Sequence, residues 1–343
     1  MSALVDALTG ALGPRCVREH VPLAPLTTFK AGGSADVLLD AQNSDAIVTG
    51  LKLAAAHNVA VTMLGGGSNV LVGDGGIGGL VIRPRGGTIA HIGDRLVRAD
   101  AAVTINGLVR WTINRGDAGL ERWAGTPGTV GGAIFGNAHW KQQPIGDLVE
   151  SVRLVRRDGT LLQVPADRME FAYDHSRLKR TGEVVLWVAF RVAPGADPAR
   201  LREAARESLA FRKRTQPLAF WSAGCIFMNP DPVRDRIPDG IPPSAGALID
   251  RAGLKGASCG GASVSSVHAN FIVSDGTATA ADIRSLIERC RAAVKEQFGV
   301  TLRDEIVYAG KFCRGPRSLV LGPQGRGLGT TPEDRGPGTV DFS

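Results

Sequence analysis

The sequence predicts an α+β protein of two or three domains, and three observations support this prediction. The chain has 343 residues, which is more than one hydrophobic core usually serves. Short apolar runs typical of strands alternate with helical patterns, and glycine-rich turns separate them. Hydrophobic residues make up 43% of the chain and charged residues 21%, which is an ordinary globular composition. No run of about 18 uncharged apolar residues occurs, so we expect no membrane insertion.

The composition also limits the cellular context and the partners. The five cysteines are odd in number and form no C-x-x-C pair, so we expect no disulfide framework, no metal site and a cytoplasmic location. The net charge of +7 has two interpretations, an arginine-rich composition or attraction to anionic small molecules such as pyrophosphates. Nucleic acid is not expected as a partner, because no recognition motif or dense basic tract accompanies the charge.

The patterns divide the chain into four parts, 1–83, 84–196, 197–312 and 313–343. The last part is rich in glycine, proline and charge and lacks apolar periodicity, so we expect a disordered tail. The apolar segment 1–12 carries Asp6 and has no basic residue before it. It therefore differs from a signal peptide, and we interpret it as a short surface helix.

Local signals predict several elements within these parts. In the first part we expect Ser44 to cap a helix that buries Ile47, Val48, Leu51 and Ala55, followed by strands at 59–64 and 80–82. In the second part we expect a helix from Thr104 to Gly116 and strands at 149–156 and 184–192, with an Asp158-Gly159 hairpin turn after the first. In the third part Thr279 and Asp282 form a capping box for a helix that ends at Gly299 and buries Cys290.

Two glycine-rich loops are candidates for ligand binding. Gly65-Gly66-Gly67-Ser68-Asn69 leaves a predicted strand, and its backbone amides can form a nest for anionic oxygens. The second loop is 125–133, with Thr126, Pro127, Gly128, Thr129 and Gly132, and Asn137 follows it; its small residues leave room for a flat ring system. By contrast, the formal G-x-G-x-x-G match at Gly73 precedes a strand instead of a helix, so we interpret it as a tight turn.

These loops and five further segments resemble UDP-N-acetylenolpyruvoylglucosamine reductases, which have a flavin fold like that of vanillyl-alcohol oxidase. The further segments are Thr27-Thr28-Phe29-Lys30-Ala31-Gly32-Gly33, Phe171-Ala172-Tyr173, Ser222-Ala223-Gly224-Cys225-Ile226-Phe227, Ala247-Leu248-Ile249-Asp250 with Gly253-Leu254-Lys255-Gly256, and His268-Ala269-Asn270-Phe271-Ile272. Their order and spacing cover 22–310. The resemblance implies that 1–83 and 84–196 are two FAD-binding subdomains, with Thr28 at the cofactor, and that 197–312 is a substrate-binding lobe.

The resemblance also implies a reaction and the residues for it. NADPH reduces FAD, and the reduced flavin transfers hydride to the enolpyruvyl carbon of a UDP-sugar substrate, while a general acid protonates the adjacent carbon. Cys225 stands where many members of the family carry the serine proton donor, and a thiol is far more acidic than a serine hydroxyl. Glu305 matches the catalytic glutamate. Tyr173, Arg214, Asn229 and His268 are the expected substrate-binding residues.

The chain departs from the family pattern at two positions. Asp174 stands where the family usually has an arginine that neutralises the enolate, and Met228 replaces a lysine near the diphosphate. Arg177 is our candidate for the missing catalytic cation, provided that a turn brings it to the same space. Arg212, Lys213 and Arg214 are candidates for the charge that Met228 lacks near the diphosphate, or they form a solvated helix end. These departures keep two alternatives open, a flavin oxidoreductase of the same fold with another substrate and a non-catalytic flavin-binding homologue. We expect a monomer.

Deletion of 314–343 tests the expectation of a disordered tail. The melting temperature and the flavin content should equal those of the full chain, because the segment offers little apolar surface to bury. Thermal unfolding and flavin absorbance of the purified truncated protein measure both quantities. A marked fall in melting temperature would contradict the expectation.

Overall fold

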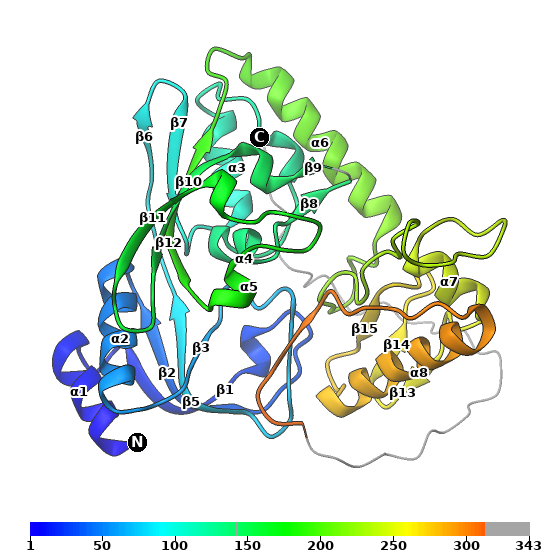
Figure 1. Ribbon diagram of the computed structural model, residues 1–343, viewed down its shortest axis with the longest axis horizontal. Coiled ribbons are helices and arrows are strands. Elements are labelled where there is room, and N and C mark those ends of the chain that lie inside the picture. Colours follow the sequence, from blue (N-terminus) through cyan, green and yellow to red (C-terminus); the bar gives the residue numbers. More distant parts are fainter. Residues whose placement is uncertain (142, 313–343) are drawn as a thin grey trace.

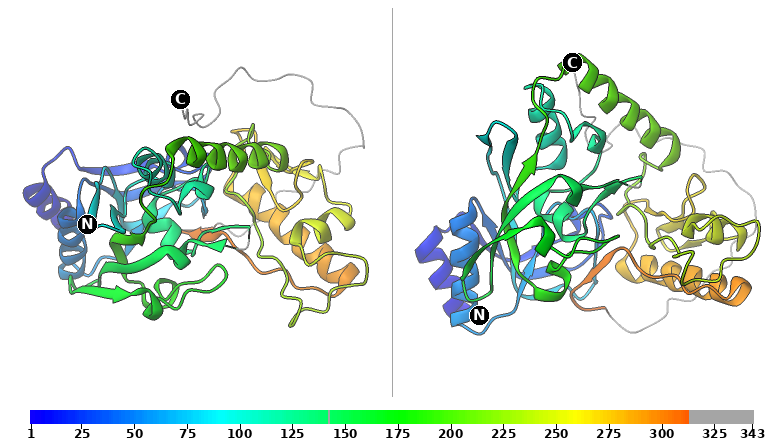
Figure 2. Two further views of the ribbon diagram at one scale, coloured as in Figure 1. Left: turned by 90° about the horizontal axis from the view of Figure 1, so that it is seen from above. Right: turned by 45° about the horizontal axis from the view of Figure 1, so that its top comes forward.

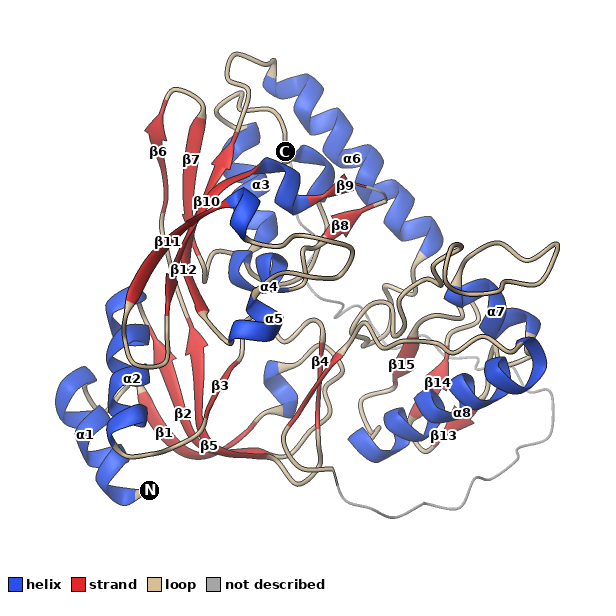
Figure 3. Cartoon of the chain, in the orientation of Figure 1, coloured by secondary structure: helices blue, strands red, loops and turns tan. Residues whose placement is uncertain are grey.

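The computed structural model describes residues 1–141 and 143–312, so the tail expected at 313–343 lies outside the described residues. Figure 1 shows three parts, two of them built on sheets and joined side by side, and a third lobe at the far end of a long helix. Helices and strands are mixed throughout (Figure 3), as an α+β protein requires. No helix among the described residues has the length and apolar character needed to cross a membrane.

The helices of the described residues are α1 (Ser2–Leu12), α2 (Ser44–Ala56), α3 (Ile105–Ile113), α4 (Val130–Phe135), α5 (Leu178–Thr181), α6 (Pro198–Thr215), α7 (Ala245–Arg251) and α8 (Ala280–Phe298). Short 3-10 turns are η1 (Ala24–Leu26), η2 (Glu121–Trp123), η3 (Ile145–Leu148) and η4 (Ala166–Arg168). The strands are β1 (Val17–Pro22), β2 (Ser34–Ala41), β3 (Val61–Met63), β4 (Val70–Val72), β5 (Ile77–Pro84), β6 (Ile89–Gly93), β7 (Leu96–Asp100), β8 (His139–Trp140), β9 (Gln143–Pro144), β10 (Val149–Val155), β11 (Leu161–Pro165), β12 (Val184–Arg191), β13 (Ser258–Cys259), β14 (Ala262–Val264), β15 (Ile272–Ser274) and β16 (Val307–Ala309).

The first part is a four-stranded sheet in the order β1-β2-β5-β3, packed against α1 and α2. The helix at 1–12 and both predicted strands are confirmed, the strands at Val61–Met63 and within Ile77–Pro84. The predicted cap of α2 was wrong by one residue, because the Asn43 side chain accepts the hydrogen bond from the Ala46 amide at 2.9 Å. The predicted inward face was also wrong at Ala55, since the helix turns Ala54 into the core instead.

The second part is a five-stranded antiparallel sheet in the order β11-β10-β12-β7-β6. The Thr104 cap is confirmed: its hydroxyl accepts from the Gly107 amide at 3.0 Å. The predicted hairpin is confirmed between β10 and β11. The long helix α6 packs Leu201 and Ala205 into this same core before it runs out to the third lobe (Figures 1 and 2), so it extends the second core beyond residue 196.

The third part is a small antiparallel sheet, β13-β14-β15, covered by α7 and α8. The predicted capping box of α8 is confirmed, since Thr279 and Asp282 exchange side-chain and backbone hydrogen bonds. Gly299 ends the helix in the left-handed conformation with a φ of 72°. Cys290 is 1% exposed in the core, as predicted.

A strand pairing and a helix cap are among the contacts that return the third lobe to the first part. Strand β16, the last described strand, pairs in parallel with β4. The carboxylate of Asp74, in the turn after β4, accepts hydrogen bonds from the Ala280 and Ala281 amides at 2.8 and 2.9 Å. These amides belong to the first turn of α8, where the helix itself leaves the N–H groups without partners. Asp74 therefore supplements the capping box from another part of the chain.

We expect Asp74→Ala to lower the free energy of unfolding by about 1 kcal/mol, the usual value of a helix cap. Chemical denaturation measures the change. Asp94→Ala is the matched control, because Asp94 is exposed in the turn between β6 and β7. Equal stability of the two variants would show that the Asp74 contacts contribute nothing to the docking of α8.

Candidate functional site

The first glycine loop, 65–69, leaves β3 and is held against the segment before β2. The Thr28 amide donates to the Gly67 carbonyl at 3.0 Å, and the Thr28 hydroxyl donates to the same oxygen at 3.3 Å. Gly67 has a φ of 64°, and a Cβ there would stand 2.1 Å from the Leu26 carbonyl oxygen. Only glycine fits this close approach. The predicted cofactor residue Thr28 thus supports the loop.

The second glycine loop, 125–133, meets the first loop face to face. A Cβ on Gly66 would lie 2.7 Å from the Gly128 Cα, and a Cβ on Gly128 would lie 2.6 Å from the Ser68 hydroxyl oxygen. Gly128 has a φ of 99°. In the structure the loop is shorter than predicted, because α4 begins at Val130. The Thr129 hydroxyl caps this helix by accepting from the Gly132 amide at 3.4 Å. The structure therefore brings together the predicted cofactor residues of both loops.

A cleft of about 650 Å³ opens beside the meeting point of the two loops. It is lined by Gly65, Gly66, Arg83, Pro84, Arg85, Gly86, Gly87, Ile89, Ala102, Val103, Thr104, Trp111 and Thr129. Glycine backbone and two arginines suit a dinucleotide with an anionic pyrophosphate, and Trp111 offers an aromatic face. These residues fit FAD. The sequence analysis missed Arg83, Arg85 and Trp111, since they carry no glycine signal and join the loops only in three dimensions.

Asn137, a further predicted cofactor residue, is 1% exposed and its amide is used within the protein. Its Oδ1 accepts from the Gly146 amide at 3.0 Å, and its Nδ2 donates to the Ala172 carbonyl at 2.9 Å. Asn137 thus connects the end of α4 to the segment that carries Tyr173.

The structure places two of the three predicted catalytic residues, Cys225 and Glu305, on neighbouring backbone segments. The Glu305 amide donates to the Ile226 carbonyl at 2.9 Å, and a β-bridge joins Phe227 to Asp304. Asn270 fixes the Cys225 side of this pairing, because its side chain exchanges hydrogen bonds of 2.9 and 2.7 Å with the Phe227 backbone. The Asn69 side chain donates to the Glu305 carbonyl at 3.2 Å. Cys225 and Glu305 therefore lie beside the first glycine loop.

The electrostatic environment keeps both catalytic candidates protonated at neutral pH. Burial, and then the nearby Asp174, raise the pKa of Glu305 to about 8, against the opposing charge of Lys179. Burial and Glu305 raise the pKa of the Cys225 thiol above its usual range, while Asn270 and Arg212 oppose the shift. Desolvation penalises the ionised form of each acid. The Cys225 thiol and the Glu305 carboxyl group can therefore each supply a proton at neutral pH.

Arg212 is a buried cation close to these two acids, and we call the group formed around Cys225 and Glu305 the centre. It is 7% exposed, its Nη2 donates to the Thr126 hydroxyl at 2.7 Å, and its guanidinium lies 4.5 Å from the Trp140 ring centroid. Burial lowers its pKa to about 10, so it remains charged at pH 7. Its Nε is buried and has no hydrogen-bond partner among the described residues. Arg212 therefore has one hydrogen-bond donor, its Nε, that is available for an anionic group.

Residues 172–175 form the turn that the sequence analysis required near the missing arginine. Ala172 and His175 exchange backbone hydrogen bonds of 3.1 Å, and Asp174 has a φ of 48°, a conformation that aspartate tolerates better than most side chains. The Asp174 carboxylate receives a hydrogen bond from Lys179 Nζ at 2.8 Å. Burial raises the pKa of Asp174, and Lys179 opposes the shift.

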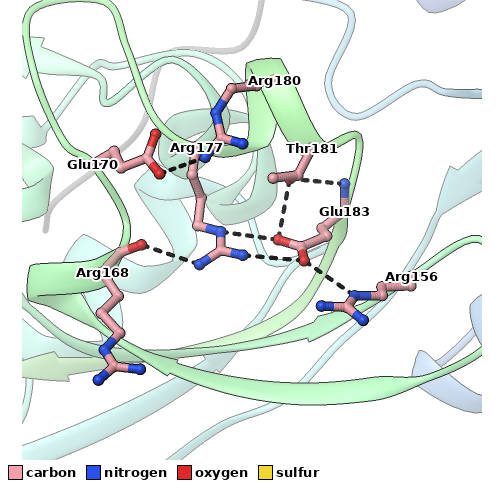
Figure 4. Close-up of polar contacts among 7 residues, drawn as sticks. All are labelled: Arg156, Arg168, Glu170, Arg177, Arg180, Thr181 and Glu183. Atoms are coloured by element: carbon pink, nitrogen blue, oxygen red, sulfur yellow. Dashed lines mark hydrogen bonds and ion pairs between the residues drawn. The ribbon is translucent and has the colours of Figure 1, made fainter.

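Arg177 does not join this centre, although the turn exists. Its Nε and Nη2 donate to the carboxylate of Glu183 at 3.0 and 3.3 Å, and its Nη1 donates to the Arg168 carbonyl at 3.3 Å (Figure 4). All three guanidinium nitrogens are occupied by this bidentate pair and the carbonyl. Arg177, the cation that we selected from the sequence, is therefore bound to the buried carboxylate of Glu183, just before β12.

The predicted substrate-binding residues are brought together in part. The Tyr173 hydroxyl accepts from the Asn229 amide at 3.3 Å, and the Asn229 side chain accepts from the Ala245 amide at the start of α7 at 3.1 Å. His268 accepts from the Asn270 amide through Nδ1 at 3.2 Å, and burial lowers its pKa. Arg214 is exposed near the end of α6.

His139 and Lys179 belong to this centre, and the sequence analysis missed both. The His139 ring lies 5.0 Å from the Tyr173 ring, centroid to centroid, and burial lowers its pKa. Neither residue lies in a segment whose pattern points to chemistry. Lys179 follows Asp174 by five residues, and this spacing does not predict a contact. The two side chains meet only because the turn at 172–175 and α5 bring them together.

Comparison with known proteins agrees with the geometry of the cleft. Residues 35–165 match the family model described as an FAD binding domain, and the two loops and the cleft lie on the same parts of the fold. Fold and site together define a flavoprotein of the FAD-binding oxidoreductase class. Residues 216–309 match the model of the C-terminal domain of UDP-N-acetylenolpyruvoylglucosamine reductase.

Curated relatives and a solved structure give the particular family. The UDP-N-acetylenolpyruvoylglucosamine reductase of Gloeobacter violaceus is 38% identical over 86% of this chain and 97% of its own, and that of Myxococcus xanthus is 38% identical over 91% and 97%. The crystal structure of UDP-N-acetylenolpyruvylglucosamine reductase from Thermus caldophilus aligns with a TM-score of 0.71 at 32% identity, over 85% of this chain and 99% of that chain. The chain belongs to the UDP-N-acetylenolpyruvoylglucosamine reductase family.

Gly66→Asp tests the assignment of the cleft to FAD. Its Cβ would force the two loops apart at Gly128, and its carboxylate would repel the pyrophosphate, so the purified variant should lose its flavin. The ratio of flavin to protein absorbance and reconstitution with FAD measure the loss. Gly10→Asp is the control, since a Cβ at Gly10 meets nothing within 4 Å. A wild-type protein that is colourless and cannot be reconstituted would refute the assignment.

Proposed function

We propose that the protein reduces UDP-N-acetylglucosamine enolpyruvate to UDP-N-acetylmuramate in peptidoglycan precursor synthesis, with FAD as cofactor and NADPH as reductant. Its relatives carry the name of this reductase. The observation that supports the proposal best is the convergence of Cys225 and Glu305, both protonated, beside the first glycine loop. That loop also lines the cleft assigned to FAD, which supports a role for the two acids beside the cofactor.

The reaction requires one hydride and one proton for each enolpyruvyl double bond. NADPH is the source of the two electrons and is oxidised to NADP⁺, and FAD, when bound, supplies the hydride chemistry. One vinyl carbon gains the hydride, and the electron pair of the double bond moves to the adjacent carbon and into the carboxylate. A protein acid then protonates that adjacent carbon. The protein must therefore hold a proton and stabilise a developing negative charge.

We assign the proton to Cys225 Sγ and the stabilising hydrogen bond to Glu305. The raised pKa of the thiol keeps it protonated until the carbanion-like carbon forms, and Arg212 offsets the negative charge that the departing proton leaves behind. Glu305, with a pKa of about 8, can donate a hydrogen bond to the enolic carboxylate at pH 7. Cysteine as donor and aspartate at position 174 make this chain a variant within its family.

The remaining site residues have proposed roles in binding. Tyr173 and Asn229 are joined across the site and present polar groups to a UDP-sugar. Arg214 is exposed and offers charge to the diphosphate, and His268 contributes a neutral ring at the edge of the lobe. We propose further that the enzyme acts as a cytoplasmic monomer and has no nucleic acid partner.

Two observations motivate an alternative within the same fold. Asp174 and Met228 alter positions that the family uses for substrate charge, which favours a flavin oxidoreductase with a different substrate. A homologue that binds flavin without turnover is the second alternative. Steady-state oxidation of NADPH with the enolpyruvyl UDP-sugar distinguishes them, because only the proposed function gives substrate-dependent turnover.

Substitution of Cys225 tests its role as the acid. Cys225→Ala should leave flavin reduction by NADPH intact and slow the oxidative half-reaction by about 10²- to 10⁴-fold, the usual contribution of a general acid. Cys225→Ser should recover part of that rate, because a hydroxyl still donates a proton. Rapid-mixing absorbance of the reduced flavin, with and without the enolpyruvyl substrate, measures each half separately.

Cys290→Ala is the control for this test, because Cys290 lies in the core of the third lobe. An unchanged oxidative rate in Cys225→Ala, together with a slow Glu305→Gln variant, would transfer the role of proton donor to Glu305. Loss of flavin reduction in Cys225→Ala would also contradict the assignment, since the acid acts only after reduction.

A further inference from the structure

The negative charge that develops on the substrate needs a cation, and neither position 174 nor the candidate selected from the sequence supplies one. Asp174 carries the wrong sign, and Arg177 is committed to Glu183 and the Arg168 carbonyl (Figure 4). Arg212 lies at the other side of the centre, between Thr126 and Cys225. The side of the centre that Glu305 occupies therefore still lacks an assigned cation.

Lys179 occupies that side. It projects from α5, and its Nζ lies 2.8 Å from Asp174 Oδ2 and 5.7 Å from the Phe135 ring centroid at the end of α4. The exposed fraction of its side chain is 26%, whereas that of Asp174 is 7%. The ammonium group therefore lies beside a buried carboxylate, and its side chain remains partly exposed. An ammonium has three N–H donors, of which Asp174 takes one.

The charged pair acts on Glu305 from the same segment of chain. Of the ionisable groups whose charges act on Glu305, Asp174 raises its pKa and Lys179 lowers it. Glu305 in turn acts on two neighbouring groups, because its charge raises the pKa of Tyr173 and of Cys225. A hydrogen bond from Asn137 to the Ala172 carbonyl holds the turn that carries Tyr173 and Asp174 against the end of α4. The position of the ammonium group is thus set by several contacts.

We propose that Lys179, held by Asp174, is the cation that binds the enolpyruvyl carboxylate and stabilises its charge during protonation. The proposal rests on the proposed function, and it gives Asp174 a role as a positioning residue. The acid at position 174 holds a cation that lies five residues further along the chain. A charge-assisted contact of this kind strengthens as the carboxylate gains electron density.

Lys179→Met should slow the oxidative half-reaction by about 10²-fold or more, with flavin reduction by NADPH unchanged. Lys179→Arg should recover part of the rate through its charge. Arg180→Met is the matched control: Arg180 is the next residue of α5 and also pairs with an acid, Glu170, but at the exposed surface. Equal oxidative rates in Lys179→Met and Arg180→Met would overturn the proposal.

A double variant separates catalysis from structure. Lys179→Met alone leaves the Asp174 carboxylate buried without its cation, which can destabilise the fold. Lys179→Met with Asp174→Asn removes both charges, so its melting temperature should return towards that of the wild type while the oxidative rate stays low. Recovery of the rate together with stability would reduce the pair to a structural role and refute the proposal.

The pH dependence of the oxidative rate gives a signed test. Activity that needs protonated Glu305 falls as pH rises through the pKa of that group. Removal of the cation in Lys179→Met should shift this fall to higher pH, and removal of the anion in Asp174→Asn should shift it to lower pH. Shifts of the same sign, or none, would contradict the arrangement. If reduced wild-type flavin is not reoxidised by the enolpyruvyl UDP-sugar under anaerobic conditions, the proposed function fails instead.

Discussion

The parallel pairing of β16 with β4 is the interaction on which the site depends. The pairing aligns Val307 with Val70, and the Val307 amide donates to the Asn69 carbonyl at 3.0 Å. The strands join the last described segment of the third lobe to the loop that lines the FAD cleft (Figure 3). Closing so long a loop has an entropic cost, which the apolar contacts of Leu71 with the core of the third lobe help to offset. The pairing thus holds the backbone that follows Glu305 against the first glycine loop.

The same pairing also determines where Cys225 lies. Glu305 is bonded through its amide to the Ile226 carbonyl, and Asn270 holds the adjacent Phe227 backbone at both its donor and its acceptor. A few hydrogen bonds thus connect three segments that are distant in the sequence, those of Phe227, Asn270 and Glu305. Each bond is between buried groups, where an unpaired partner would be costly. The relative position of the two acids is therefore set by backbone contacts, which substitutions of neighbouring side chains disturb little.

The charges of the centre are arranged around these acids. The charge of Arg212 opposes the rise in the pKa of the thiol, and that of Lys179 opposes the rise in the pKa of the carboxyl group, while Asp174 is paired directly with Lys179. Burial strengthens the electrostatic interaction between these charges, because the protein interior has a lower dielectric constant than water. It also explains why the acids stay protonated, since their ionised forms would lose hydration. The buried Asp174 carboxylate is compatible with the site because it is paired with Lys179.

Local patterns in the sequence determined the elements and the glycine loops. The Thr104 cap, the hairpin at Asp158-Gly159 and the α8 capping box each depend on neighbouring residues, and all three were predicted correctly. The family motifs further located Cys225 and Glu305. Only the tertiary structure decided which cation serves the centre. It directs Arg177 to Glu183 and Lys179 to Asp174, because the direction of a long, flexible side chain is chosen by buried partners and turns that no local spacing encodes.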